Sequence, residues 1–344
     1  HGTIGGLIAG GLFVLPGAFV VLALSALYAG FGGVPLIAAL FAGVQAAVVA
    51  VVIEALLRVS KRALKTPAHR WIALVAFLAL FVFALPFPLV ILTAGIFGIM
   101  TARAAPQGVA APSVAHAQTL KTIAIWGAVW LAPLAALILF EGGILADIGV
   151  YFSKLAVLTF GGAYAVLAWL VQDVVAINGW LTTPQMMDGL GLAETTPGPL
   201  ILVTEFVGFM AAFKTGGWMM GLAGAAVAVW MTFAPCFLWI FAAAPYIARL
   251  TGNPRLGAAL GGIMAAVVGV IASLSLWFAL HVIFDRLTSL SLGPARLLWP
   301  DFSSLDPVAL AIALVAGYLL LGRHWSLPLV LAVAAFGAAG VSLI

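Results

Sequence analysis

Charge is scarce in this chain of 344 residues. Lys and Arg number 14, Asp and Glu number 10, and charged residues make up 7% of the sequence. Soluble domains carry about 25% charged residues, so this scarcity excludes an ordinary soluble globular protein. The basic residues are also too few and too scattered to neutralise phosphates along a groove, so the net charge of +4 does not indicate a nucleic-acid partner.

Cysteine is scarcer still. The one cysteine, Cys236, excludes an intrachain disulfide and any metal site built from several cysteines. It lies in an apolar run, so we interpret it as a small buried packing residue. The sequence also lacks a Walker A loop, a His-Glu-x-x-His motif and a Gly-x-Ser-x-Gly motif. We therefore expect no cofactor, no metal and no ATP-driven step, which leaves ion gradients as the energy source.

Apolar sequence is abundant instead. Hydrophobic residues make up 65% of the chain, and its mean hydropathy is +1.26. At about 20 apolar residues per span, the chain has room for about ten membrane segments. We therefore predict an all-α polytopic membrane protein. Hydropathy places long spans at 6–28, 34–57, 120–140, 218–244 and 256–284, and shorter ones at 71–85, 86–101, 306–321 and 325–344.

An internal repeat divides the sequence into two halves. A shift of 219 places Gly43 on Gly262 and the Ala-Ala-Val-Val run of 46–49 on 265–268, while a shift of 240 places 73–76 on 313–316. The segment 102–119 is rich in alanine, proline and glycine and is interpreted as a linker. The halves are then 1–101 and 120–344. Counterparts of 150–213 would precede His1, so we expect the first half to be incomplete at its N-terminal side.

Loop charges predict the orientation of the halves. The first half carries five basic residues at 58–70, in the loop that follows the span 34–57. The second half carries Arg249 and Arg255 in the loop that precedes the corresponding span, 256–284. Lysine and arginine stay on the cytoplasmic side. The two halves should therefore have inverted topology, which is a signature of secondary transporters.

Two segments of the second half interrupt the apolar pattern. In the first, Gly161 and Gly162 weaken a helix at membrane depth and expose backbone amides, which must face protein or water. Thr159 and Tyr164 add hydroxyl groups. Lys154 can add positive charge, although reaching back to the interface is an equal alternative for it. Close helix packing through small residues is the alternative explanation for the two glycines.

The second interruption centres on Pro197-Gly198-Pro199, which cannot continue a regular helix. We expect two half-helices to meet there, with an extramembrane turn as the alternative. The N-terminus of a half-helix presents free N–H groups and about half a positive charge, which suits an anion. Thr195 and Thr196 add hydroxyl donors. Burying an unpaired dianion would cost tens of kcal/mol, so we expect both breaks to converge on one cavity.

Two glutamates lie at membrane depth, where carboxylates mark proton or ion pathways. Glu194 directly precedes the second break and Glu205 follows it. A glutamate that is protonated while substrate is bound can couple anion movement to protons. Asp173 and Asp188 flank the polar turn 178–184, where interfacial solvation or helix capping is the expected role.

Other polar residues have structural explanations. Glu54 ends a span one helical turn before Arg58, so we expect an ion pair. His281 stands alone in a span, and we interpret it as a packed or interfacial residue rather than a ligand.

Several segments resemble the chromate ion transporter family of bacterial inner-membrane proteins. They are Phe-Gly-Gly-Ala-Tyr-Ala-Val at 160–166, Gly-Trp-Leu-Thr at 179–182, Asp-Gly-Leu-Gly-Leu-Ala-Glu-Thr-Thr-Pro-Gly-Pro-Leu at 188–200, Thr-Phe-Ala-Pro-Cys-Phe-Leu-Trp-Ile at 232–240 and Asn-Pro-Arg-Leu at 253–256. The resemblance covers nearly the whole chain. Long members of the family have two homologous halves, and this chain lacks the first-half copies of the Gly-Gly and Gly-Pro signatures. Glutamine is more usual in the family where Glu205 stands.

The resemblance implies gradient-driven export of chromate through a multi-pass protein of the inner membrane, with sulfate as the competing anion of the same shape. Uptake or exchange of sulfate or a related oxyanion is the alternative. A membrane-embedded enzyme is a remote alternative, because the sequence shows neither a nucleophile and base pair nor a metal cluster. The expected partners are the oxyanion, protons and the lipid bilayer, and a homodimer is kept as an option.

Overall fold

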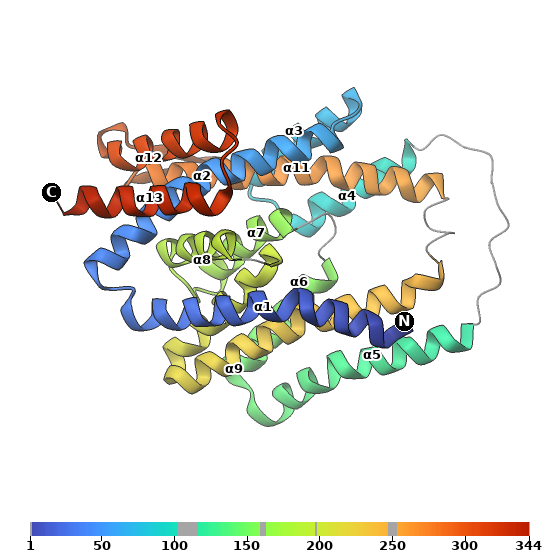
Figure 1. The fold of residues 1–344 in the computed structure, drawn as a ribbon. Helices are drawn as coiled ribbons and strands as arrows, with labels where there is room; N and C mark the ends of the chain where they lie inside the picture. The colour runs from blue at the N-terminus through green and yellow to red at the C-terminus, as the bar shows by residue number, and fades with distance from the viewer. Residues whose placement is uncertain (1, 102–115, 159–162, 197, 247–252, 344) are drawn as a thin grey trace. The chain divides into compact units, whose positions relative to one another are not determined.

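The computed structural model describes residues 2–101, 116–158, 163–196, 198–246 and 253–343. Within them, five helical segments are long and apolar enough to cross a membrane: Gly2–Phe31, Pro35–Ala63, Ala117–Phe140, Leu200–Tyr246 and Pro254–Ile283. Four shorter apolar helices are Pro67–Phe81, Phe87–Met100, Pro307–Gly322 and Leu327–Ser342. Every span predicted from hydropathy has a helical counterpart, so the prediction of a helical polytopic membrane protein is confirmed (Figure 1).

The outer surface of these helices fits lipid. Leucine, isoleucine, phenylalanine and tryptophan side chains are exposed along them, among them Leu12, Phe13, Phe97, Phe140 and Met219. In water, such a surface would be an extensive apolar patch of the kind that monomers avoid. In hydrocarbon it carries no penalty, since the backbone groups of a helix are satisfied internally.

The described chain divides into two compact units. Unit 1 comprises residues 1–29, 99–159 and 196–259, and unit 2 comprises 30–98, 160–195 and 260–344. Each unit takes helices from both sequence halves. Two of the points at which the chain passes between the units, 159–160 and 195–196, are next to the two predicted breaks. Residues 102–115, most of the predicted linker, lie outside the described residues, and the remainder of that linker begins helix α5.

Unit 1 is built from four helical elements. They are α1 (Gly2–Phe31), α5 (His116–Ala136) with its π-helical extension Leu137–Glu141, α6 (Gly143–Leu158) and α9 (Val203–Ala243). Helix α9 is interrupted at Gly216 and Gly217, and Gly217 has a φ of 69° that side chains rarely tolerate. Its two arms fold against each other, because a Cβ atom on Gly208 would lie 2.6 Å from the carbonyl oxygen of Gly224.

Unit 2 contains the remaining elements. Its helices are α2 (Pro35–Ala63), α3 (Pro67–Phe81), α4 (Phe87–Met100), α7 (Ala163–Val171) with the π-helical Gln172–Ile177, α8 (Thr183–Thr195), α11 (Pro254–Ile283), α12 (Pro307–Gly317) with the π-helical Tyr318–Gly322, and α13 (Leu327–Ser342). At 1.5 Å per residue, α3, α4 and α13 are about 21 to 24 Å long. They are too short to cross a hydrocarbon layer of about 30 Å upright.

The sequence repeat reappears in unit 2 as a pair of reciprocal contacts. A Cβ atom on Gly43 of α2 would lie 2.2 Å from the carbonyl oxygen of Ala334 on α13. A Cβ atom on Gly262 of α11 would lie 2.4 Å from the carbonyl oxygen of Ala94 on α4. The shift of 219 relates the two glycines and the shift of 240 relates the two alanines. Each half therefore supplies the glycine of one contact and the carbonyl of the other.

A second pair of contacts follows the same rule. On α11, Gly269 faces the backbone nitrogen of Phe77 on α3, and a Cβ atom there would lie 2.7 Å from it. The counterparts, Ala50 on α2 and Gly317 on α12, are also neighbours, since a Cβ atom on Gly317 would lie 3.9 Å from the Cβ atom of Ala50. Figure 1 shows α2 and α11 running in opposite directions. These contacts agree with the predicted repeat of inverted topology.

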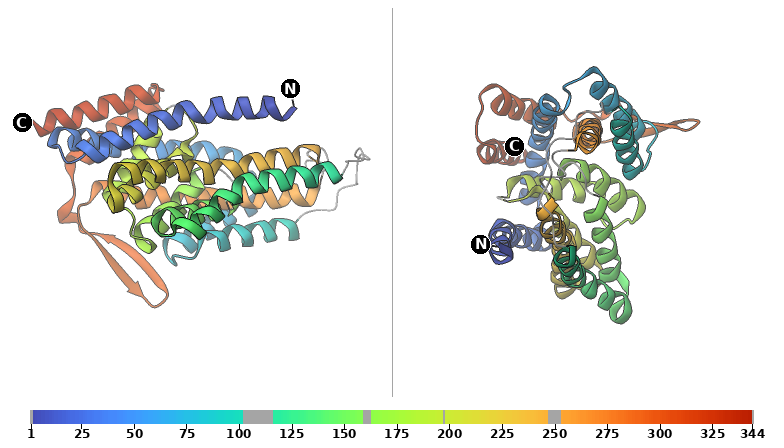
Figure 2. Two further views of the ribbon diagram at one scale, coloured as in Figure 1. Left: turned by 90° about the horizontal axis from the view of Figure 1, so that it is seen from below. Right: turned by 90° about the vertical axis from the view of Figure 1, so that its right-hand side faces the viewer.

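One element of unit 2 was not predicted. Strands β1 (Leu287–Leu292) and β2 (Ala295–Pro300) form an antiparallel hairpin where we expected a loop. A positive φ of 62° at Gly293 makes the tight turn. The amide of Arg296 donates to the carbonyl oxygen of Val82 at 2.7 Å, which ties the hairpin to the end of α3. Figure 2 shows the hairpin projecting from the helices of this unit.

The close approach at Gly262 predicts a stability difference within one helix. Gly262→Ala should lower the free energy of unfolding by about 1 to 3 kcal/mol, because the new methyl group meets backbone that cannot move aside. Gly257→Ala is the control, since a Cβ atom there meets nothing within 4 Å. Denaturant unfolding of the purified protein in detergent measures both variants. Equal stability of the two variants would contradict the contact between α11 and α4.

Candidate functional site

The first predicted break lies between α6 and α7. Helix α6 ends at Leu158 and α7 begins at Ala163. Thr159, Gly161 and Gly162 lie outside the described residues, as does the side chain of Tyr164, so their roles stay predictions. Two described helices nevertheless flank the glycines.

Lys154 lies on the exposed side of α6. Its neighbours Ser153 and Leu155 are buried, and Ser153 accepts a hydrogen bond of 3.1 Å from the indole of Trp130. The lysine therefore points away from the packed side of its helix. This placement is compatible with both roles that the sequence left open for it.

The second predicted break separates α8 from α9. Helix α8 ends at Thr195, a 3₁₀ turn covers Leu200–Leu202, and α9 starts at Val203. Pro197 lies outside the described residues. Gly198 has a φ of 137°, and a Cβ atom there would lie 3.3 Å from the Cα atom of Gly17 on α1. Both the conformation and the close approach require glycine at this position.

The two threonines at this break differ. The hydroxyl of Thr195 donates to the carbonyl oxygen of Leu192 at 2.8 Å, so its hydrogen is engaged within α8. In this arrangement Thr195 presents only oxygen lone pairs outward. Thr196 is half-buried in the segment that leads to Gly198.

Glu205 lies in the first turn of α9 and is 4% exposed. Among the described residues its Oε2 atom has no hydrogen-bond partner. Next to it in the chain, the hydroxyl oxygen of Thr204 lies 3.3 Å from that of Thr232, which is on the second arm of α9. A polar layer thus crosses the buried interface between the two arms. Glu194, in the last turn of α8, is half-buried.

Thr204 and Thr232 were not predicted as site residues. Thr204 donates its hydroxyl hydrogen to the carbonyl oxygen of Ile201 in the 3₁₀ turn, at 2.9 Å, and Thr232 donates to that of Ala228 in its own helix, at 2.7 Å. A threonine whose hydroxyl bonds to nearby backbone does not stand out in a hydropathy profile. Only the fold shows that these two threonines face each other.

The prediction for Asp188 was wrong. It is not a capping or interfacial residue: it lies inside α8, is 8% exposed, and accepts a hydrogen bond of 2.5 Å from the amide of Gln45 on α2. Helix α8 also approaches α2 closely at Gly191, where a Cβ atom would lie 2.8 Å from Val44. These contacts fix α8, and with it the end that carries Glu194, against the long helix α2. The partner was missed because it stands 143 positions away in the sequence.

Three further interpretations have outcomes. Glu54 forms the predicted ion pair with Arg58. His281 is packed as predicted, with its Nδ1 atom 2.8 Å from the carbonyl oxygen of Trp277 and its ring against that indole. Cys236 is exposed, so the interpretation as a buried residue was wrong. An apolar run does not imply burial in protein when the surrounding medium is lipid.

Among the described residues, no group of three or more His, Cys, Asp or Glu side chains is arranged to hold a metal ion.

A multi-pass helical protein with an internal repeat, an interrupted helix and buried carboxyl groups is typical of the class of membrane transporters. The chain matches the chromate transporter family over residues 1–99 and 146–341, and it belongs to this family. The family consists of transport proteins, which argues against the remote alternative of a membrane-embedded enzyme.

Individual relatives agree. The chain is 34% identical to a chromate transport protein of Pseudomonas aeruginosa over 307 residues, covering 85% of this chain and 68% of the relative. It is 29% identical to a chromate transport protein of Cupriavidus metallidurans, with 83% and 68% covered. It is 28% identical to a probable chromate transport protein of Synechococcus elongatus, with 92% and 77% covered. No solved structure matches the chain.

The contact between α8 and α2 can be tested by a double-mutant cycle with Gln45→Leu and Asp188→Leu. Because the amide donates to a buried carboxyl group, the two substitutions should be coupled by about 1 to 3 kcal/mol in unfolding free energy. Denaturant titration of the parent, both single variants and the double variant gives this number. Strictly additive effects would contradict a direct contact.

Proposed function

We propose that this chain carries chromate out of the cytoplasm across the bacterial plasma membrane. The observation that carries the proposal is the family match along both halves, which includes the Thr-Pro-Gly-Pro segment at the observed end of α8. Two of the relatives described above are named for chromate transport. Export is the direction that the sequence resemblance implies.

The binding residues in this proposal flank the two breaks. Backbone amides at a helix start that follows a break donate to the oxygens of the tetrahedral dianion, since a helix start presents unpaired N–H groups. The side chains that add to these amides come from both breaks, and the glycines let the backbone approach the anion. The proposed set is Thr159, Gly161, Gly162, Tyr164, Thr195, Thr196 and Gly198, with Lys154 as the source of full positive charge. To donate to the anion, Thr195 has to turn its hydroxyl away from the carbonyl oxygen of Leu192.

Proton coupling is the proposed energy source. Glu205 is buried and its Oε2 atom has no partner among the described residues. An ionised carboxylate in such a place would cost several kcal/mol, so the residue holds a proton in this arrangement. Releasing that proton into water when the site opens would link the movement of the dianion to the proton gradient. Glu194, one residue before the proposed binding threonines, is the second proton carrier.

Sulfate is the competing substrate. It has the tetrahedral shape and the double negative charge of chromate, and backbone amides do not distinguish oxyanions of one shape and charge. Uptake or exchange of sulfate is therefore the second candidate function, and transport assays have to include both anions.

Thr196→Val and Glu194→Gln test the proposed site. Losing a hydrogen bond to a dianion costs about 1.5 kcal/mol or more, so Thr196→Val should reduce kcat/KM for chromate export about ten-fold. Cells that express Thr196→Val or Glu194→Gln should accumulate nearly as much chromate as cells that lack the protein. Thr122→Val, on the exposed side of α5, and Glu54→Gln, at the ion pair with Arg58, are the matched controls.

If Thr196→Val and Glu194→Gln protect cells as well as the parent does, the proposed binding residues are wrong. If the parent alters cellular sulfate but never chromate, sulfate transport replaces chromate export.

Glu205→Gln tests the coupling. The variant keeps the shape of the side chain but cannot release a proton, so chromate export should respond less to an imposed pH gradient than export by the parent does. In the parent, a protonophore should abolish export in vesicles. Parent export that is indifferent to the pH gradient would remove the proton from the mechanism.

A further inference from the structure

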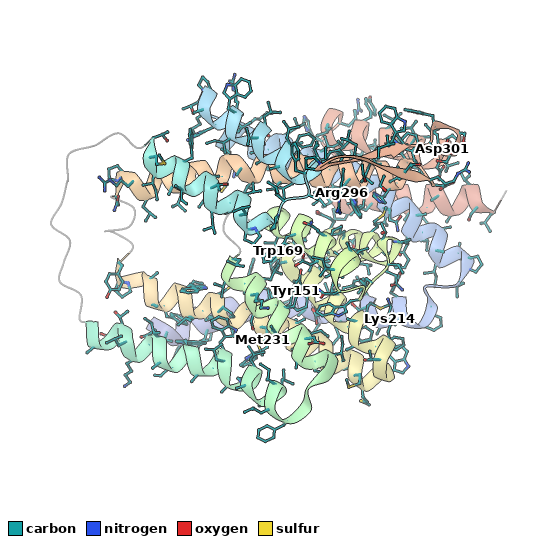
Figure 3. The ribbon with its side chains drawn as sticks, turned by 180° about the vertical axis from the view of Figure 1, so that it is seen from behind. Tyr151, Trp169, Lys214, Met231, Arg296 and Asp301 are labelled. Carbon is teal, nitrogen blue, oxygen red and sulfur yellow. The ribbon has the colours of Figure 1, made fainter. Side chains whose placement is uncertain are left out.

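Unit 2 contains a cavity of about 350 Å³ that the proposed function does not use. Its walls come from five separate parts of the unit: the turn between α3 and α4, α7 with its π-helical extension, the start of α8, the C-terminal part of α11, and β2. Two of the lining residues, Trp169 on α7 and Arg296 on β2, are labelled in Figure 3. The volume falls within the range of small-molecule sites, about 300 to 1,000 Å³.

Four polar side chains line this cavity without a protein partner. Among the described residues, no hydrogen bond or ion pair engages the side chain of Gln172, Thr183, Ser273 or Arg296. Polar groups inside a folded protein are normally hydrogen-bonded. Of the four, Ser273 is buried, Gln172 and Thr183 are half-buried and Arg296 is exposed, so the lack of a partner at Ser273 is what indicates a ligand that accepts hydrogen bonds.

Ser273 gives the sharpest evidence. It is 9% exposed, so its hydroxyl has little access to outside water. A serine inside a helix usually donates to the carbonyl oxygen one turn back, and Ser275 does so, with a bond of 2.8 Å to Ile271. Ser273 makes no such bond among the described residues. Its hydroxyl is left for whatever fills the cavity.

The charge of the lining indicates an anion. Arg296 is the one residue with a permanent charge among those that line the cavity, and the lining contains no aspartate or glutamate. The other arginine of the hairpin, Arg286, pairs with Asp301 at 3.4 Å. Arg296 is held in place by its backbone bond to Val82, and Leu298, two residues on, lines the same cavity, as expected for one face of a strand.

The remaining walls are aromatic and rigid. Trp169 stacks on Phe87 with ring centroids 5.6 Å apart, and Trp277 lies against His281 at 4.1 Å. Apolar walls with a few placed polar groups are typical of a binding site for a small ligand.

The cavity belongs to the extracytoplasmic end of unit 2. The basic loop 58–70 places the end of α2 and the start of α3 in the cytoplasm. Helix α3 starts in that loop, so its other end, where Leu80 and Phe81 line the cavity, points away from the cytoplasm. The hairpin is bonded to that end through the carbonyl oxygen of Val82.

We propose that this cavity is a second anion site, an outer vestibule that holds a tetrahedral oxyanion group through Arg296. A guanidinium group binds such a group with two parallel hydrogen bonds. Ser273, Thr183 and Gln172 donate to its remaining oxygens. The identification of the oxyanion as transported chromate or sulfate rests on the proposed function. The phosphate of an anionic lipid has the same chemistry, and the experiment separates these sources.

The test uses the full chain in vesicles of both orientations. Arg296→Gln should raise the chromate concentration for half-maximal transport about ten-fold from the extracytoplasmic face, and leave the value from the cytoplasmic face within two-fold. Arg286→Gln, on the same hairpin, is the matched control and should change neither value. A damaged fold would alter both faces together, so equal changes, or no change, from Arg296→Gln would overturn the vestibule.

A second pair of variants keeps the test independent of charge. Ser273→Ala should raise the half-maximal concentration from the extracytoplasmic face about three-fold. Ser275→Ala, whose hydroxyl is engaged within α11, should not. Equal effects of the two serine variants would overturn the role of Ser273.

The lipid source is tested by composition. Vesicles of phosphatidylcholine alone are compared with vesicles that are half phosphatidylglycerol. Competition by phosphatidylglycerol that disappears in Arg296→Gln would assign the cavity to lipid phosphate and overturn the free oxyanion. Equal values in both lipids, with the effect of Arg296→Gln retained, support the free anion.

Equilibrium binding of radioactive sulfate to the purified chain separates this inference from the proposed function. The parent should bind about one sulfate more per chain than Arg296→Gln does. If the parent binds sulfate in this way but moves no chromate, the proposed function fails and the anion site stands. If the parent moves chromate and Arg296→Gln binds as much sulfate as the parent, the proposed anion site is refuted and the proposed function stands.

Discussion

Unit 2 depends on backbone that meets backbone at two glycines, Gly43 against Ala334 and Gly262 against Ala94. In lipid, no hydrophobic effect drives helices together, so association relies on close van der Waals contact, which small residues permit. The long helices α2 and α11 are each fixed in this way to a helix of the other sequence half. Helix α2 then holds α8 through Asp188, and α11 carries Ser273 to the cavity, so both candidate sites of this unit rest on the same two contacts.

The parts that sequence predicted well are those governed by short-range physics. Hydrophobic length located every span within a few residues, and the prolines around Gly198 predicted the end of α8, because neither property depends on distant partners. The repeat predicted which helices correspond. The prediction for Asp188 was wrong because its environment depends on a distant partner. That partner is Gln45, a polar residue inside an apolar helix far away in the chain.

The β-hairpin and the cavity were also beyond local reasoning. Residues 287–300 mix leucine and serine and contain too few β-branched residues to predict strands. The hairpin is bonded to the end of α3, a contact that the sequence does not reveal. Gln172, Thr183, Ser273 and Arg296 come from four different elements. Each is ordinary when read alone, and their shared lack of partners becomes visible only when the fold brings them to one place.

The hairpin also limits the depth of unit 2 in the membrane. Strand β1 pairs with β2 on one side, and within the described residues no other strand covers its second edge. An open strand edge is not tolerated in hydrocarbon, since its amide and carbonyl groups would go unsatisfied. This ribbon must therefore lie at or above the headgroup level, which fixes how deeply the neighbouring end of α11 can sink into the bilayer.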